Sequence, residues 1–175
     1  MQFHDDKKDY TSLTISSAVL RKEICDKAVW LKIVEEVASA MLHVHKVGFL
    51  HNDIKMNNVV LDKIEEKDVE YNPVLIDFGK SLPMSGLRGP KTLSKVRQRK
   101  YMVEFPHIAP EIVTGKGGQS VQSDIFSYEK LIEGIFLKAK LGPLPDVLNR
   151  TSSVDPDRRP TLEEVLNFLT FRTNS

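Results

Sequence analysis

The sequence predicts one mainly helical domain with a little β structure near the middle of the chain. Apolar residues recur at helical spacing in two long stretches, 27–47 and 124–139. Short β-type runs lie at 59–61 and 74–76. The chain has 175 residues, 41% hydrophobic and 28% charged, which suits a globular domain with one core. The expected fold class is therefore mainly α, with short β hairpins.

Composition limits the environments and partners that we expect. The net charge of +1 predicts no general attraction to nucleic acid or to an anionic membrane. The single cysteine, Cys25, excludes an internal disulfide framework and indicates a reducing compartment. No apolar run approaches the roughly 20 residues that span a bilayer, and residues 1–10 lack a signal peptide's apolar stretch. We expect a cytoplasmic location, with the nucleus as the other possibility.

Two helices are expected in the amino-terminal part. Residues 16–24 are compatible with a short one. Asp26 is a suitable N-cap for a longer one, and Gly48 is a suitable stop. The apolar residues at helical spacing between them are Trp30, Ile33, Val34, Val37, Met41, Leu42 and Val44. These positions predict the side of the long helix that faces the core.

The middle of the chain is expected to combine short strands with long connections. Runs 59–61 and 74–76 are typical of strands, and 63–73 between them resembles a charged turn. Residues 80–103 contain Gly and Pro without an apolar period, so we expect a long loop there. Loops of that length in compact domains are uncommon and often functional.

Capping residues mark two further helices near the carboxyl end. Ser123 is expected to cap a helix over 124–139. Thr161 and Glu164 form a capping box at the start of the last helix.

The polar run HNDIKMNN at 51–58 is the strongest functional signal. Asp77 follows an apolar strand and precedes Phe78-Gly79, where a carboxylate is well placed to bind a hard cation. Asn58 could supply a second oxygen, the ligand type that Mg²⁺ prefers. Asp53 would then be left to accept a proton, and Lys55 to meet a phosphate.

These residues carry a resemblance to protein kinases. The run 51–58 looks like the kinase catalytic loop, and 77–79 is similar to the D-F-G motif. Ala109-Pro110-Glu111 resembles A-P-E, while 123–128 and 155–160 resemble two later landmarks of the family. The resemblance covers roughly residues 1–170 and implies a kinase-like carboxy-terminal lobe of the serine/threonine type, helical with short β hairpins around the catalytic loop.

The resemblance implies a role for each motif residue. Asp53 would be the catalytic aspartate, and Lys55 would neutralise charge on the transferred phosphoryl group. The metal ligands would be Asn58 and Asp77, holding Mg²⁺. The residues facing ATP would be Val60, Ile76, Lys55, Asn58 and Asp77. A protein substrate is the implied partner.

The resemblance also implies structural contacts and a division of the domain. His51, Phe78 and Asp124 would anchor the loops onto the helix near 123, and Glu111 and Arg159 would form a buried pair. The implied parts are a hinge-like start (1–15), a catalytic loop (51–58), an activation segment (77–111) and a helical subdomain (123–170).

Three departures from the family matter. Asn52 replaces the usual arginine, which in the family commonly grips a phosphorylated activation loop. The interval from Asp124 to Asp155 is short and leaves little room for the usual intermediate helix. No glycine-rich loop or V-A-I-K-like strand precedes the catalytic loop, so we expect the amino-terminal lobe to be missing.

Several functions stay open at this point. The chain could belong to a kinase that uses ATP, to a pseudokinase-like binding module, or to a kinase of small molecules. The 80–103 segment has seven basic residues and no acid: Lys80, Arg88, Lys91, Lys95, Arg97, Arg99 and Lys100. It is either a solvated loop or a basic platform for an acidic substrate or partner.

Overall fold

The structure is a computed structural model that describes residues 13–64, 70–87, 89, 92–143, 148, 150, 151 and 153–173. Of the hinge-like start predicted over 1–15, residues 1–12 lie outside the described residues. The mainly α class is confirmed, because helices make up most of the described chain. The helices are α1 (Ile15–Arg21), α2 (Lys27–Lys46), α3 (Lys95–Glu104), α4 (Pro110–Thr114), α5 (Val121–Ala139) and α7 (Leu162–Thr173), with 3₁₀ turns at Met56–Asn58, Phe78–Lys80, Met84–Gly86 and Pro156–Arg158.

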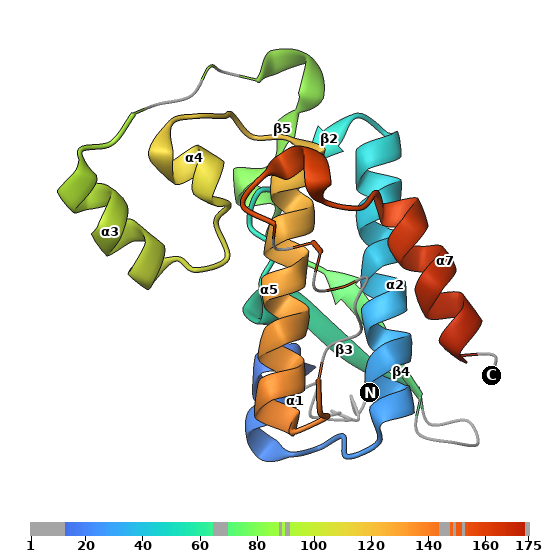
Figure 1. Cartoon of the computed structure of the whole chain (residues 1–175). Coiled ribbons are helices and arrows are strands. Elements are labelled where there is room, and N and C mark those ends of the chain that lie inside the picture. Colours follow the sequence, from blue (N-terminus) through green and yellow to red (C-terminus); the bar gives the residue numbers. More distant parts are fainter. Residues whose placement is uncertain are drawn as a thin grey trace, which may run out of the picture.

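The two long helices form the centre of the molecule. Figure 1 shows α2 and α5 running side by side, with α7 packed along α2 and a β hairpin behind them. Trp30 of α2 and Tyr128 of α5 are both completely buried in this core. The Tyr128 hydroxyl donates to the Val34 carbonyl oxygen at 2.7 Å, which ties α5 directly to the backbone of α2. Helices α3 and α4 stand to one side of this central body.

A small antiparallel sheet lies behind the long helices in the order β1-β3-β4, and a second pair joins β2 to β5. The strands are β1 (Leu13–Thr14), β2 (Phe49–Leu50), β3 (Val59–Ile64), β4 (Glu70–Leu75) and β5 (Leu82–Pro83). Strands β3 and β4 are both longer than the predicted runs 59–61 and 74–76. Backbone pairing continues through the pairs Asp62↔Asn72 and Lys63↔Tyr71. Of the predicted turn 63–73, residues 65–69 lie outside the described residues.

The two amino-terminal helices begin at side-chain caps. The Asp26 carboxylate accepts from the Ala28 backbone N–H at 2.8 Å, which confirms the predicted start of α2. Gly48, with φ +87°, follows the end of α2 as expected. Helix α1 begins one residue earlier than predicted and ends at Arg21 rather than residue 24. It stops there because Lys22 is in the left-handed conformation and its N–H bonds back into the last turn.

The predicted N-cap of α5 was wrong by three residues. Ser120 is the cap, and its hydroxyl accepts from the Ser123 N–H at 3.2 Å. The Ser123 hydroxyl in turn accepts from the Ser120 N–H at 2.9 Å, so Ser123 is the third residue of a capping box. The box predicted for α7 is confirmed by reciprocal bonds between Thr161 and Glu164, at 2.8 and 3.2 Å.

The loop predicted over 80–103 was also wrong, because this segment contains β5 and most of α3. Ser94 caps α3, but none of its ten residues, all described, is fully buried. A helix that is not packed into a core needs no apolar period, so the pattern that reveals buried helices was missing here.

Candidate functional site

The 51–58 loop is fixed to the start of α5 by one buried carboxylate. Asp124 accepts hydrogen bonds from the backbone N–H groups of His51, at 2.8 Å, and Asn52, at 2.9 Å. Its Oδ2 also lies 3.0 Å from Nε2 of His45. Asn52 has φ +62°, a left-handed conformation that costs a non-glycine residue energy. The bonds to Asp124 hold the loop in that conformation.

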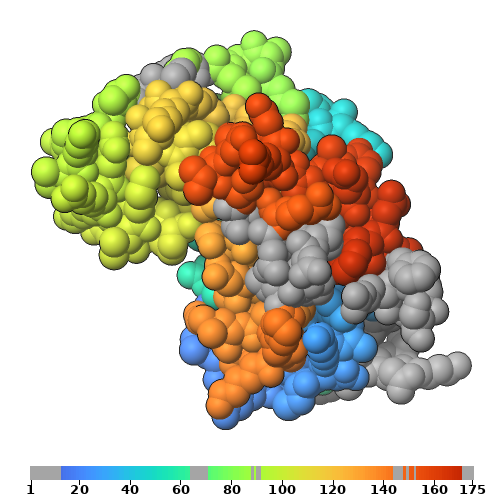
Figure 2. Space-filling model, in the orientation of Figure 1, coloured from blue at the N-terminus to red at the C-terminus, as the bar shows by residue number. Residues whose placement is uncertain are grey.

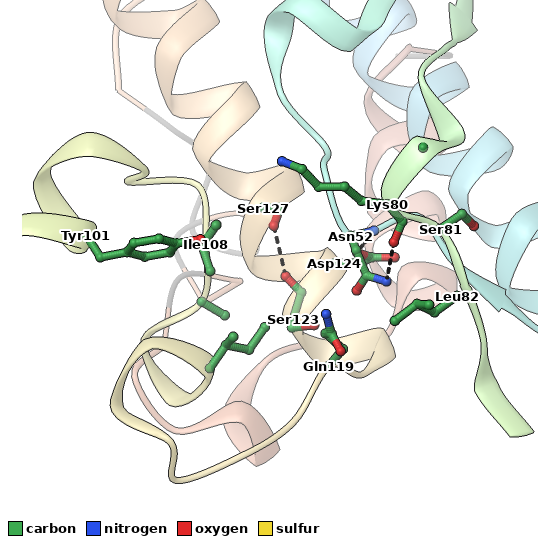
Figure 3. A pocket seen from close by; sticks show the side chains of 13 residues that line it. Asn52, Lys80, Ser81, Leu82, Tyr101, Ile108, Gln119, Ser123, Asp124 and Ser127 are labelled. Atoms are coloured by element: carbon green, nitrogen blue, oxygen red, sulfur yellow. Dashed lines mark hydrogen bonds between the residues drawn. The ribbon is translucent and has the colours of Figure 1, made fainter. Parts of the chain in front are cut away.

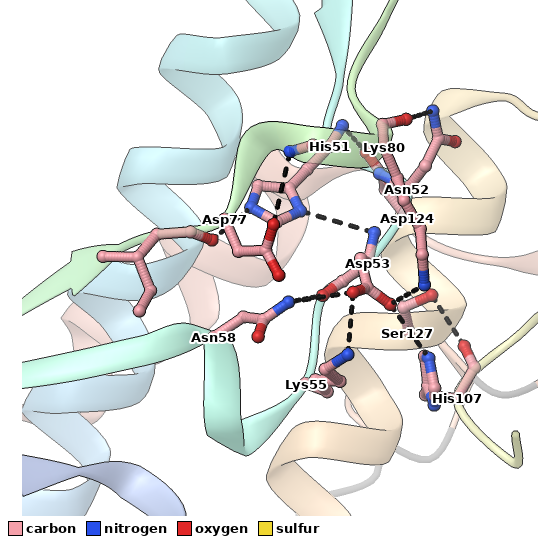
Figure 4. Close-up of polar contacts among 12 residues, drawn as sticks. His51, Asn52, Asp53, Lys55, Asn58, Asp77, Lys80, His107, Asp124 and Ser127 are labelled. Atoms are coloured by element: carbon pink, nitrogen blue, oxygen red, sulfur yellow. Dashed lines mark hydrogen bonds and ion pairs between the residues drawn. The ribbon is translucent and has the colours of Figure 1, made fainter.

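Asp53 is at the centre of the site and is 2% exposed. Its Oδ2 accepts from Nζ of Lys55 at 2.7 Å and from Nδ2 of Asn58 at 3.0 Å. Its Oδ1 accepts from Nζ of Lys80 at 2.9 Å and lies 3.3 Å from Nε2 of His107. Figure 4 shows these four side chains converging on the Asp53 carboxylate. Sequence reasoning grouped Asp53 with Lys55 and Asn58 but missed Lys80 and His107 as neighbours.

The surrounding cations determine the ionisation of the site. Burial raises the pKa of Asp53, but the hydrogen bonds and charges of Lys55 and Lys80 outweigh it and hold the pKa well below its usual range. Burial lowers the pKa of His107, which the nearby Asp53 carboxylate only partly opposes. At neutral pH, Asp53 is therefore a carboxylate and His107 is mainly neutral.

The D-F-G segment lies next to this cluster. Asp77 directly follows Ile76 in a left-handed conformation (φ +62°), and its carboxylate accepts from the Gly79 N–H at 3.3 Å. The His51 ring contacts residues on both sides of Asp77. Its Nε2 is 3.1 Å from the Ile76 carbonyl oxygen, and its centroid is 4.7 Å from that of Phe78. The predicted anchoring through His51, Phe78 and Asp124 is confirmed.

The oxygen atoms of Asn58 and Asp77 are suitable ligands for a hard cation. Asn58 is buried, and its Nδ2 donates to the backbone oxygen of Asp53 at 2.9 Å as well as to the carboxylate. That leaves the amide oxygen to act as a ligand, and Figure 4 shows Asn58 and Asp77 on the same side of Asp53. Among the described residues no group of three or more His, Cys, Asp or Glu is placed to hold a metal. One amide and one carboxylate fit Mg²⁺, which commonly binds few protein ligands and completes its shell with phosphates and water.

An apolar surface borders the Asp77 side of the site. Val60 is half-buried and pairs across the hairpin with Val74, which is 42% exposed. Ile76 is 37% exposed. Alternation along β3 directs Val59 and Leu61 into the core and leaves Val60 on the second, more open face. Val60 and Ile76 were singled out from the sequence, whereas Val74 emerges only from the strand pairing.

The predicted pair at the end of the 77–111 segment is confirmed. The Arg159 guanidinium donates to both carboxylate oxygens of Glu111, at 2.7 and 2.8 Å, and both side chains are buried. It also donates to the carbonyl oxygens of Ser153 and Gln122, each at 2.8 Å, and lies 5.0 Å above the Phe126 ring. Arg159 therefore connects Glu111 of α4 to Gln122 at the start of α5.

A cavity of about 360 Å³ lies beneath Asn52, between β5, α3 and α5 (Figure 3). Leu82, Tyr101 and Ile108 form much of its apolar wall. The Asn52 amide group donates to the Lys80 carbonyl oxygen at 3.1 Å, and its buried oxygen has no hydrogen-bond partner among the described residues. The Lys80 backbone is therefore bonded to Asn52, while the ammonium group of the same residue is bonded to Asp53.

The described basic residues of 80–103 have two different surroundings. Lys80 is committed to Asp53, whereas four others are exposed on α3: Lys95, Arg97, Arg99 and Lys100. Figure 2 shows α3 projecting at the edge of the molecule. Arg88 and Lys91 lie outside the described residues.

Comparison with known proteins agrees with the geometry. The family model of the protein kinase domain matches residues 7–141, so the chain belongs to the protein kinase domain family. It is similar to the serine/threonine-protein kinase/endoribonuclease IRE1a of Arabidopsis thaliana, at 26% identity over 157 residues, 78% of this chain and 18% of the relative. It is also similar to the maternal embryonic leucine zipper kinase of Danio rerio, at 26% identity over 157 residues, 75% of this chain and 21% of the relative.

A shorter match is somewhat closer in sequence. The ribosomal protein S6 kinase alpha-4 of Mus musculus is 34% identical over 92 residues, 53% of this chain and 10% of that protein. The chain thus spans about a fifth or less of the length of these relatives. Among the described residues, no helix is both long and apolar enough to cross a membrane.

Proposed function

We propose that this chain carries the catalytic residues of a protein kinase that transfers the γ-phosphate of ATP to serine or threonine. The observation that carries the proposal is the Asp53 carboxylate, ionised, buried and bonded to Lys55 and Asn58 in a loop anchored by Asp124. Lysine at position 55 and the serine/threonine kinases among the relatives support this acceptor class.

In the proposed reaction, Asp53 orients the acceptor hydroxyl and takes up its proton. The hydroxyl oxygen forms a bond to the γ-phosphorus, the bond from that phosphorus to the β–γ bridging oxygen breaks, and ADP leaves with the electron pair. Lys55, 2.7 Å from Asp53, is close enough to neutralise charge on the phosphoryl group while it holds the carboxylate.

The neighbouring residues would bind the nucleotide. Asn58 and Asp77 would hold Mg²⁺, which when bound neutralises charge on the ATP phosphates. Val60 and Ile76 would form an apolar wall for the adenine, which their partial exposure supports. ATP and Mg²⁺ are therefore the cofactors that we propose, and a protein is the substrate.

The alternatives rest on different observations. A pseudokinase-like binding module is favoured by Lys80 and His107, which cover Oδ1 of Asp53. The basic surface of α3 would suit an acidic partner in either case. A small-molecule kinase is less favoured, because such enzymes generally lack the A-P-E segment and the arginine that pairs with it.

The test is phosphoryl transfer with an amino-terminal kinase lobe supplied. The sequence before residue 51 offers no glycine-rich loop or phosphate-binding lysine, so we expect residues 1–175 alone to have little activity. Losing one preorganised donor commonly costs about 10²–10³ in rate. Joined to a standard amino-terminal lobe, the chain should phosphorylate serine or threonine peptides.

Asp53→Asn should abolish that transfer, while the matched variant Asp62→Asn, on the exposed part of β3, should preserve it. A well-folded but inactive two-lobed protein would favour the binding-module alternative. Asp53-dependent turnover by residues 1–175 alone would show that the other half of the site is not required.

A further inference from the structure

Asp53 offers an incoming hydroxyl only one oxygen. Oδ2 already accepts from Lys55 and Asn58, which belong to the same loop as Asp53 itself. Oδ1 accepts from Lys80 and lies beside His107, both of which come from the 77–111 segment. Because Asn58 on Oδ2 is buried whereas the Lys80 side chain on Oδ1 is 58% exposed, Oδ1 is the oxygen that a substrate hydroxyl can reach, and one of the two groups there must move.

Lys80 is the group that can move most easily. Its side chain is 58% exposed, whereas that of His107 is 15% exposed. The His107 backbone is also held, because its carbonyl oxygen accepts from the Ser127 hydroxyl at 2.7 Å. The Lys80 carbonyl is fixed by Asn52, so only the flexible side chain needs to swing toward solvent.

The displaced ammonium exchanges its carboxylate partner for water unless another negative group lies within reach. The 80–103 segment contains no acidic residue. Glu104 lies 3.8 Å from Lys100, and the Asp77 carboxylate is turned to the Gly79 N–H. An acidic group on the substrate can supply the missing charge, and it would arrive together with the hydroxyl.

We infer that Lys80 is a specificity-determining residue that favours acceptor hydroxyls flanked by a carboxylate or phosphate. The inference rests on the proposed function, because it concerns the substrate of that same site. Without an acidic neighbour, Lys80 stays on Asp53 and competes with the hydroxyl. With one, the ammonium transfers to the substrate and Oδ1 becomes free.

The exposed cations of α3 have a different effect. Lys95, Arg97 and Arg99 would attract acidic peptides over a distance, in a way that salt screens. Such attraction does not specify where in the peptide the acidic residue lies. Lys80 acts within reach of Asp53 and so selects the position next to the acceptor.

The test compares two labelled serine peptides of equal composition and charge: the Asp peptide has Asp beside the serine and Asn several residues away, and in the Asn peptide these two residues are exchanged. Binding to the whole chain is measured by fluorescence anisotropy. We expect the wild type to prefer the Asp peptide about two- to fivefold, the range of one partly exposed ion pair. Lys80→Met should remove the preference, and Lys138→Met, which removes an exposed charge far along α5, should keep it. Asp53→Asn should strengthen the preference, because Lys80 then loses its competing carboxylate.

Kinetics in the two-lobed protein give a second readout. Lys80→Met should raise kcat/KM for the Asn peptide, since Oδ1 is uncovered, and bring the ratio between the two peptides to about one. A merely structural role for Lys80 would lower both values together. A preference that survives Lys80→Met, or the lack of any preference in the wild type, would overturn the inference. A preference in binding without phosphoryl transfer would instead contradict the proposed function and leave the role of Lys80 supported.

Discussion

Glu111 and Arg159 are 48 residues apart in sequence and meet in a two-pronged ion pair, at 2.7 and 2.8 Å, with both side chains buried. The pair joins the end of the 77–111 segment to the turn that precedes α7. Because both side chains are buried, removing one partner leaves the other as a buried charge without its counter-ion.

The first prediction concerns this pair. Glu111→Ala and Arg159→Ala should each lower the free energy of unfolding by about 3–5 kcal/mol, and the double variant should cost less than the sum. Urea denaturation measures all three. Arg158→Ala is the matched control, because the neighbouring arginine is highly exposed and should change stability by less than about 1 kcal/mol. Additive effects for the pair would argue against the coupling.

The second prediction concerns the anchor of the 51–58 loop. Asp124→Asn replaces one carboxylate oxygen by an NH₂ group, which cannot accept, so one of the two bonds from the His51 and Asn52 N–H groups is lost. We expect a loss of about 2–4 kcal/mol in unfolding free energy. Hydrogen exchange at the two backbone amides should accelerate more than exchange inside α2. Unchanged exchange at these amides would contradict the anchoring role.

The third prediction concerns pH. The folded-state pKa of Asp53 lies below its unfolded value of about 3.9, so the unfolded chain binds more protons in this range. The stabilisation is therefore complete above about pH 5 and is lost as the pH falls toward the folded-state pKa. Urea midpoints should drop more steeply between pH 5 and 3 in the wild type than in Asp53→Asn. Asp62→Asn should follow the wild type, and parallel curves for Asp53→Asn would contradict the expectation.

The fourth prediction concerns the metal. If Asn58 and Asp77 bind Mg²⁺, calorimetry of the two-lobed protein should show tighter ATP binding with Mg²⁺ than with a chelator. Asp77→Ala should remove that difference, because only one protein oxygen ligand remains. Asp62→Ala, which removes an exposed aspartate from β3, is the control. Equal ATP affinity with and without Mg²⁺ in the wild type would exclude the assignment.

The fifth prediction tests the contact between Thr92 and the end of α4. Gly115 has φ +69°, and an added Cβ would lie 2.8 Å from the Cα and the hydroxyl oxygen of Thr92. Gly48 has φ +87° but open space around it, so Gly48→Ala carries only the backbone cost of about 1–2 kcal/mol. Gly115→Ala should cost at least about 1 kcal/mol more. Equal urea midpoints would show that the Thr92 segment yields freely.

The sequence by itself determined the features that depend on near neighbours. Asp26 predicted the start of α2, and Thr161 with Glu164 predicted the start of α7, because a cap and its helix are only a few residues apart. Helical spacing identified buried residues of α2 such as Trp30. The pairing of Glu111 with Arg159 was also predicted, but through resemblance to a family rather than from local physics.

The tertiary structure alone decided what reaches Asp53. Lys80 and His107 are 27 and 54 residues away, and no periodicity or spacing connects them to it. They meet because Asp124 holds the 51–58 loop and the Ser127 hydroxyl holds His107, so that α5 positions both segments. Helix α3 was missed for a related reason, since a helix without a buried face leaves no apolar pattern to read. The sequence predicted Asp53 as the central carboxylate. The packing of the 51–58 loop and the 77–111 segment onto α5 decided that Lys80 and His107 lie next to it.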